Sequence, residues 1–98
     1  MTRQEALALC DEMVEIVGQS PGVLYQVEQR IDKIEWALQQ CDGDAYFREK
    51  LTAAVGFLRI WRSPRKWQQW GSDPSRLHSV VLGNLSKLRS VIMQQVPE

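Results

Sequence analysis

The sequence predicts an all-α protein, a small antiparallel four-helix bundle made of two helical hairpins, either complete in one chain or completed by dimerisation. Four segments carry apolar residues at the 3–4 spacing of amphipathic helices, and no alternating strand pattern competes with them. Short connections make consecutive helices antiparallel. The length of 98 residues corresponds to one helical domain over residues 1–98. A chain this short buries only about 60–65% of its unfolded surface, so self-association would add burial.

The first two helices are predicted from their caps and stripes. Thr2-Arg3-Gln4-Glu5 has a capping-box pattern, and Gly18 is placed to end the first helix. Ser20-Pro21 then predicts a new start. The first apolar stripe is Ala6, Cys10, Met13 and Val17. The second is Leu24, Val27, Ile31, Ile34, Leu38 and Cys41, which is the spacing of a heptad seam.

The third helix, predicted over about 44–62, is apolar over an unusually wide arc. Gly43 closes the preceding helix and Asp44 is a candidate cap. One stripe is Phe47, Leu51, Ala54, Leu58 and Trp61, and a second is Tyr46, Ala53, Phe57 and Ile60. Such a helix packs on more than one side, so we expect it to be central or to form part of a subunit interface.

The fourth helix is predicted over 74–95, because Asp73-Pro74 is a strong helix start. Its core stripe is Leu77, Val81, Leu85, Leu88 and Ile92. Another face carries only small residues, and we expect it to face solvent: Ser79, Gly83, Ser86 and Ser90.

The charge distribution and the two cysteines indicate the kind of environment in which the protein works. Residues 1–50 hold ten acids and five bases, whereas residues 51–98 hold two acids and seven bases. We expect the halves to complement each other within the bundle or across a dimer; the alternative is a basic face for a polyanion. Cys10 and Cys41 should lie too far apart for a disulfide, as two buried thiols. No signal-peptide layout or membrane-length apolar run is present, so we expect a cytoplasmic protein that binds no membrane.

Catalytic patterns are sparse. His78 is the single histidine, and nothing in the spacing places a nucleophile and an orienting group beside it. No zinc-ligand spacing and no glycine-rich phosphate loop occur, so no cofactor is expected. We therefore expect a protein that is not an enzyme.

Carboxylates are the exception to this pattern. Glu12 and Glu15 are followed by Glu28, Asp32 and Glu35, and facing carboxylates on two helices can hold Mg²⁺. The arrangement is similar to the all-α nucleoside-triphosphate pyrophosphohydrolases, with Glu-x-x-Glu followed by Glu-x-x-Asp. That resemblance would imply a Mg²⁺-dependent nucleotide hydrolase. It covers about 25 residues, and here the second pair has its acids exchanged, as Asp32-Lys-Ile-Glu35.

Arg59 to Trp70 is the most distinctive stretch of the chain, with four cations and three of the four tryptophans in twelve residues. Ser63-Pro64 interrupts its helical pattern, and Ser63 could cap a short helix through Trp70. The stretch is either a cap folded over the end of the bundle, with arginine stems on the rings, or a contact surface. Its candidate partner-binding residues are Arg59, Arg62, Arg65, Lys66, Trp67 and Trp70.

Two further aromatics lie on the outer face of the second helix. Trp36 falls opposite the apolar seam, and Tyr25 returns to within about 20° of the same face. Burial against the fourth helix and burial against another chain are the two alternatives, and aromatic residues of this type are favoured interface anchors. We therefore add Trp36 and Tyr25 to the partner-binding set.

Together these patterns predict a helical protein–protein interaction module of the adaptor or regulator type. Its partner would be a protein of unknown identity, bound through residues 59–70, and the chain would form a homodimer through its second or third helix. The alternative is a nucleic-acid-binding regulator that uses the same cations on phosphates and stacks tryptophan on bases. The metal-dependent hydrolase is the third hypothesis.

Overall fold

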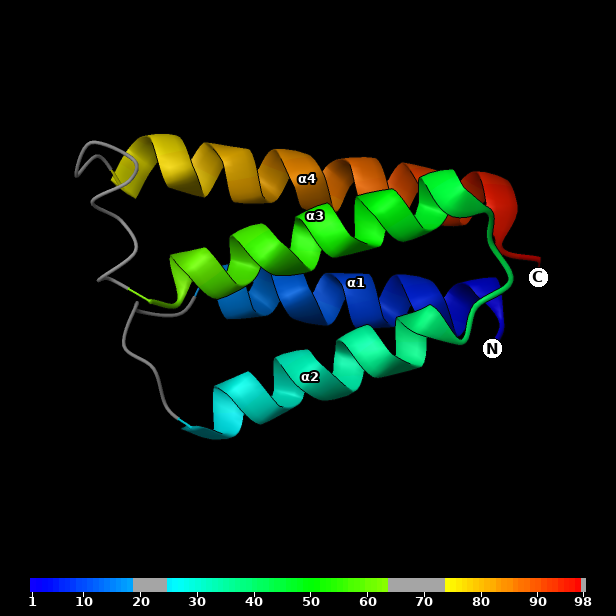
Figure 1. Ribbon diagram of the computed structural model, residues 1–98, viewed down its shortest axis with the longest axis horizontal. Coiled ribbons are helices and arrows are strands. Elements are labelled where there is room, and N and C mark those ends of the chain that lie inside the picture. Colours follow the sequence, from blue (N-terminus) through cyan, green and yellow to red (C-terminus); the bar gives the residue numbers. More distant parts are fainter. Residues whose placement is uncertain (19–24, 64–73, 98) are drawn as a thin grey trace.

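The computed structural model is an antiparallel four-helix bundle and describes residues 1–18, 25–63 and 74–97. The helices are α1 (Arg3–Val17), α2 (Tyr25–Gln39), α3 (Ala45–Trp61) and α4 (Pro74–Gln95), and each runs opposite to the one before it (Figure 1). The predicted all-α fold class is therefore confirmed. No strand occurs within the described ranges.

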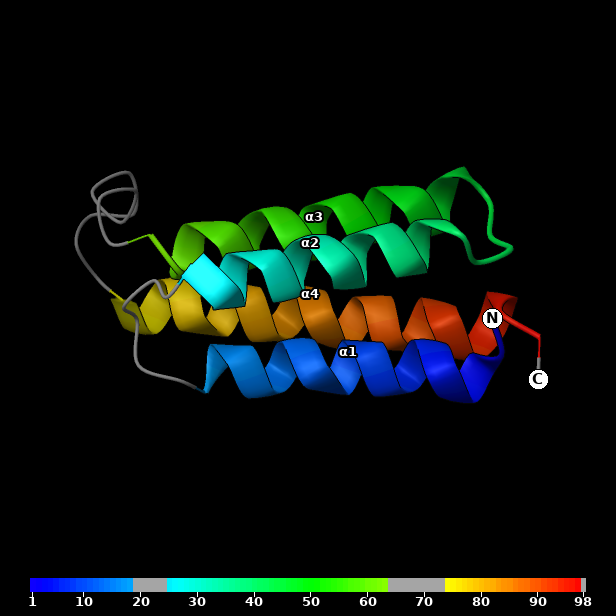
Figure 2. The ribbon, with the colours of Figure 1, turned by 90° about the horizontal axis from the view of Figure 1, so that it is seen from below.

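The four helices form a skewed square in cross-section. Neighbours in sequence contact each other, α4 also packs on α1, and the cross-bundle pair α1 and α3 touch. In the described part of the chain, α2 and α4 do not contact each other. Figure 2 shows α3 and α1 at opposite sides of the molecule. Because α1, α3 and α4 all contact one another, these three helices form a closed group, and α2 rests against α1 and α3 only.

The core consists of the stripes that the sequence predicts. Each helix turns its main stripe inward, and Phe47, Met13 and Leu58 are among the large side chains that are fully buried. Of the predicted core residues, only Leu24 lies outside the described residues. The core is continuous from one end of the bundle to the other and also takes in Ile16, Val55, Val91 and Val96.

Capping side chains define the starts of α1 and α3. The hydroxyl of Thr2 accepts a hydrogen bond from the backbone N–H of Glu5 at 3.2 Å. A carboxylate oxygen of Asp44 accepts one from the N–H of Phe47 at 3.1 Å, and this bond lowers the pKa of Asp44. Both satisfy donors that a helix start otherwise leaves open. The two predicted caps are confirmed.

Ion pairs link residues of different helices. Acidic residues of the first half bind basic residues of the second half on α3 and α4, so the charge halves complement each other inside one chain. A third pair joins α1 to α2. The pairs are Arg59 with Asp32 and Glu35, Arg89 with Asp11, and Arg30 with Glu12.

The two ends of the described chain meet at one end of the bundle (Figure 1). The backbone N–H of Arg3 donates to the carbonyl of Pro97 at 3.0 Å, and its Nε donates to the carbonyl of Val96 at 3.0 Å. Nearby, the N–H of Asp44 donates to Oε1 of Gln95 at 3.1 Å. These bonds hold the start of α1 and the connection between α2 and α3 against the end of α4.

Both cysteines are buried and free, as predicted. The Sγ of Cys10 lies 3.6 Å from the carbonyl oxygen of Leu85, and burial raises the pKa of this thiol to about 11. Cys41 packs its sulfur 3.4 Å from that of Met1, and burial raises its pKa as well. None of the helices in the described ranges has the length and apolar character needed to cross a membrane.

Candidate interaction surfaces

Arg59 lies at the last turn of α3 and reaches across to α2. Its Nη2 is 3.0 Å from Oε1 of Glu35 and 2.7 Å from Oδ1 of Asp32, while Nη1 donates to Oε2 of Glu35 at 3.4 Å. The guanidinium is therefore held in a fork by Glu35 and also bound by Asp32. Hydrogen bonding to Glu35 raises the pKa of Arg59. In this arrangement Arg59 joins two helices of its own chain.

Arg62 follows at the end of α3 and is only 2% exposed. It lines a polar cleft of about 280 Å³ between the start of α2 and the end of α3, together with Glu28, Ile31, Asp32, Arg59 and Ser63. The cleft brings two cations and two carboxylates together. A group that is buried to this extent presents little charge to solvent, so Arg62 would have to move before it could contact a large partner.

The rest of the arginine- and tryptophan-rich stretch lies outside the described residues. This applies to Arg65, Lys66, Trp67 and Trp70, to the short helix predicted after Ser63, and to the side chain of Tyr25. Their role in partner binding stays a prediction. The flanking helix ends can be placed: α3 ends and α4 begins at the same end of the bundle as the start of α2 (Figure 1).

Trp36 projects from the outer face of α2 and is 67% exposed. The inner face of that helix is filled by its heptad seam, and the ion pairs of Arg59 tie the flank of α2 to α3. Of the two alternatives for this residue, burial against α4 is wrong, since α4 does not contact α2 within the described residues. Tryptophan side chains are highly buried on average, so the exposure of this indole is unusual.

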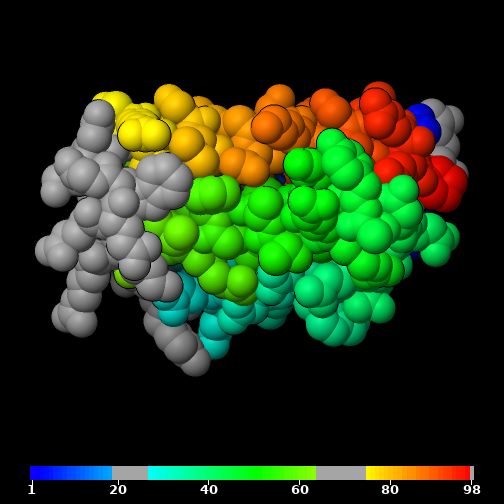
Figure 3. All heavy atoms as spheres, turned by 45° about the horizontal axis from the view of Figure 1, so that its top comes forward, coloured from blue at the N-terminus to red at the C-terminus, as the bar shows by residue number. Residues whose placement is uncertain are grey.

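A second apolar surface lies on the outside of α3, and we call it the α3 ridge: Ala53, Gly56, Phe57 and Ile60. The four residues are partly exposed, and together with Thr52 they line a shallow hollow of about 200 Å³. In Figure 3, α3 runs across the middle of the visible face, between α4 and α2. Tyr46, from the same predicted stripe, is 51% exposed and carries the ammonium of Lys50 at 5.1 Å from its ring centre.

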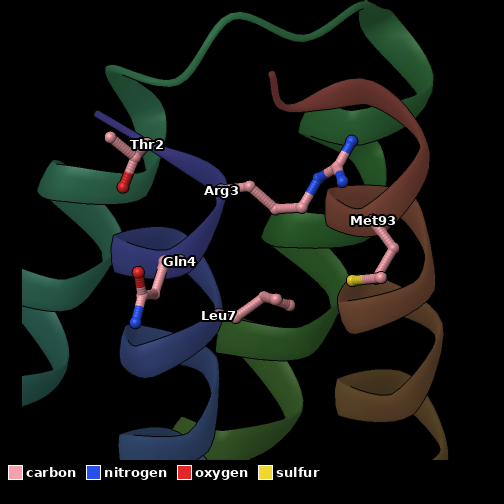
Figure 4. Close-up of a pocket in the computed structure, with 5 residues that line it drawn as sticks. All are labelled: Thr2, Arg3, Gln4, Leu7 and Met93. Carbon is pink, nitrogen blue, oxygen red and sulfur yellow. The ribbon is translucent and has the colours of Figure 1, made fainter. Parts of the chain in front are cut away.

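A third hollow of about 430 Å³ lies between the start of α1 and the end of α4. Leu7 and Met93 approach it from the two helices, and Arg3 extends toward the end of α4 (Figure 4). The Nε of Arg3 is hydrogen-bonded to the carbonyl of Val96. Because that bond fixes the side chain to the end of α4, the hollow is part of the junction between the chain ends.

The residues considered for catalysis have structural partners. The ring of His78 is half-buried, with its centroid 5.1 Å from that of Trp61 and the two planes inclined at 52°. Glu12 binds Arg30 at 2.8 Å, and both Asp32 and Glu35 bind Arg59. The described ranges contain no group of three or more His, Cys, Asp or Glu side chains arranged to hold a metal.

Comparison of the chain with protein-family models, with curated proteins and with solved structures found no match.

Proposed function

We propose that this chain is a non-enzymatic helical module for protein–protein interaction, with the outer face of α2 as its contact surface. One observation carries the proposal, namely the 67% exposure of Trp36 on a helix whose inner seam is already buried. A tryptophan at the surface combines a large apolar area with a polar N–H group. For this reason it is strongly enriched among the residues that dominate binding energy at interfaces.

The neighbourhood of Trp36 suits a protein partner. Asp32 and Lys33 are exposed on the same helix and Gln40 is exposed just after its end, so the indole has neighbours that can form a polar rim. The face predicted for Tyr25 continues this surface along α2 toward the end of the bundle where α3 ends. The predicted contacts from Arg65, Lys66, Trp67 and Trp70 would extend it from that end.

The nucleic-acid alternative has less support among the described residues. Of its predicted phosphate-binding cations, Arg59 is bound by two carboxylates and Arg62 is buried. The exposed flank of α2 carries Asp32, which would repel phosphate. A phosphate-binding mode would lose affinity steeply and log-linearly with rising salt, whereas a tryptophan-anchored protein contact would lose little. Salt therefore separates the two functions.

The test compares partner capture by three forms of the immobilised protein in native cell extract. Wild type is compared with Trp36→Ala and with Tyr46→Ala, a matched removal of an exposed aromatic from another helix. We expect one or more proteins to be retained by wild type and by Tyr46→Ala, and to be lost at least about tenfold with Trp36→Ala. Retention should change little between low and high salt.

Two results would contradict the proposal. If the Trp36→Ala protein retains the same partners as wild type, the indole does not anchor a contact. If the bound material is nucleic acid that is released by moderate salt, the regulator alternative is favoured. Circular dichroism of the three forms confirms that each remains folded before capture is compared.

A further inference from the structure

We propose that the outer groove between α2 and α3 binds an acidic segment of a partner protein. In this complex Arg48 holds an aspartate or glutamate side chain of the partner, and Trp36 holds an apolar neighbour of that residue. The proposal rests on the interaction function proposed above and adds the chemistry of the partner. The two can fail separately, because the function depends on Trp36 and the partner chemistry depends on Arg48.

A polar hollow of about 410 Å³ lies in this groove, between the end of α2 and the first half of α3. We call it the α2–α3 hollow, and its lining residues are Gln39, Gln40, Arg48, Leu51 and Thr52. Four of these five residues are polar and exposed, and Leu51 is buried. The hollow lies at the end of the bundle where α2 ends and α3 begins (Figure 1). It is large enough to admit a side chain of another protein.

Arg48 is the charged residue of this lining. Its Nη1 donates to the carbonyl of Gln39 at 3.3 Å. With the residues that the structure describes, Arg48 forms no ion pair. An arginine side chain has five N–H donors, and the bond to Gln39 uses one of them. The guanidinium can therefore still form the two parallel bonds by which arginine binds a carboxylate.

The bond to Gln39 also fixes the position of the guanidinium. Gln39 is the last residue of α2, and the carbonyls at a helix end receive no donor from the helix itself. Arg48 satisfies one of these carbonyls and is thereby held at the edge of the α2–α3 hollow. A side chain that is already ordered loses less conformational entropy when a partner binds. The contact with α2 therefore prepares Arg48 for a carboxylate.

Trp36 lies one turn of α2 before this hollow. The side-chain amide of Gln40 donates to the carbonyl of Trp36 at 3.3 Å, and residues four apart lie on one side of a helix. The exposed indole offers an apolar surface, whereas the amide of Gln39 and the hydroxyl of Thr52 can bond to the backbone of a partner. An apolar contact and a carboxylate contact are thus separated by about one helical turn.

The charges of the groove favour a single carboxylate over a row of phosphates. At the other end of the groove, Arg59 is already bound by Asp32 and Glu35. Asp32 precedes Gln39 by seven residues, or about 10 Å along α2. A nucleic-acid strand would bring several phosphates and would meet this acidic end. A peptide can instead present one acidic side chain to Arg48 and uncharged residues elsewhere.

The experiment selects ligands from a displayed library of short random peptides on the immobilised full chain. Wild type is compared with Arg48→Gln, with Trp36→Ala and with Arg89→Gln, a matched loss of an exposed arginine that already pairs with Asp11. We expect wild type and Arg89→Gln to enrich peptides that carry Asp or Glu near an apolar residue. Arg48→Gln should lose the acidic preference, and Trp36→Ala should lose the apolar preference.

Titration of the best wild-type peptide then measures the contact of Arg48 directly. The dissociation constant should rise at least about fivefold with Arg48→Gln. A copy of the peptide with its acid replaced by the corresponding amide should bind wild type and Arg48→Gln equally weakly. This second peptide tests the contact on the wild-type protein, so the result does not depend on how the variant folds.

Three results would overturn the proposal. They are no enrichment over the bare support, an acidic preference that Arg48→Gln keeps, and an equal loss of that preference in Arg89→Gln. Displacement of the peptide by single-stranded DNA at lower concentration than by free peptide would also overturn it and assign the groove to nucleic acid. Failure of the interaction function looks different, because Trp36→Ala would then enrich the same peptides as wild type.

Discussion

Replacing Trp61 by phenylalanine should remove a contact that closes the end of α1. Trp61 is 8% exposed and comes from the last turn of α3. Its Nε1 donates to the carbonyl of Val17 at 3.1 Å. That carbonyl belongs to the final turn of α1, where the helix itself supplies no donor. The indole therefore acts both as core packing and as a donor to a buried helix end.

The magnitude follows from these two roles. A hydrogen bond contributes about 1 kcal/mol on average, and a buried acceptor left without its donor costs about 1–3 kcal/mol. The smaller phenylalanine ring also leaves a void, which we take as costing about 1 kcal/mol by comparison with other large-to-small core changes. Trp61→Phe should therefore lower the free energy of unfolding by about 2–4 kcal/mol.

Urea unfolding followed by circular dichroism measures this loss without depending on indole fluorescence. Trp36→Phe is the control, because that side chain is exposed, and its effect should stay within about 0.5 kcal/mol. The slope of the transition should be the same in all three proteins. A loss under about 0.5 kcal/mol for Trp61→Phe, or an equal loss in the control, would refute this account of the end of α1.

Two other perturbations test the polar contacts. Arg59→Met keeps the apolar stem but leaves Asp32 and Glu35 facing each other. Because the Arg59 side chain is 40% exposed, solvent screening limits the loss in free energy of unfolding to about 1 kcal/mol. Urea titrations should show a smaller loss at high salt. Burial raises the pKa of Cys10 to about 11, so its neutral thiol contributes stability at pH values below about 9. This contribution is lost as the pH rises from about 9 through 11. Wild type should lose up to about 2–3 kcal/mol across that window. Cys10→Ala should show a clearly smaller alkaline loss, and equal slopes for the two proteins would contradict the assignment.

Much of the fold could be predicted from local patterns. The 3–4 spacing of Phe47, Leu51 and Leu58 identifies the inner side of α3, because burial of one side imposes that period. Thr2 and Asp44 could be assigned as caps for an equally local reason, since a capping side chain bonds to an N–H three residues ahead. Features that depend on a single helix, or on the order of helices, are therefore visible in the sequence.

The contacts of the candidate site were harder to predict from the sequence, because they join residues that are distant along the chain. Arg59 and Arg62 were grouped with the tryptophans that follow them, although Arg59 finds its partners 24 and 27 positions earlier in the chain. An antiparallel pairing about the turn at Gly43 places Glu35 opposite residue 51, which is about 12 Å from Arg59 at 1.5 Å per residue, so this register does not predict the bond. Periodicity alone also could not show that Ala53, Phe57 and Ile60 of the second stripe of α3 are partly exposed, not fully buried.

The uneven packing of α2 has a consequence for local unfolding. Because α2 contacts α1 and α3 but not α4 within the described residues, it can detach while the other three helices stay together. Its amide protons should then exchange with solvent through a low-energy opening that leaves the amides of α4 protected. A molecule that clamps the indole of Trp36 would have to hold α2 in place. Its binding would therefore be recorded as slower deuterium uptake across this one helix.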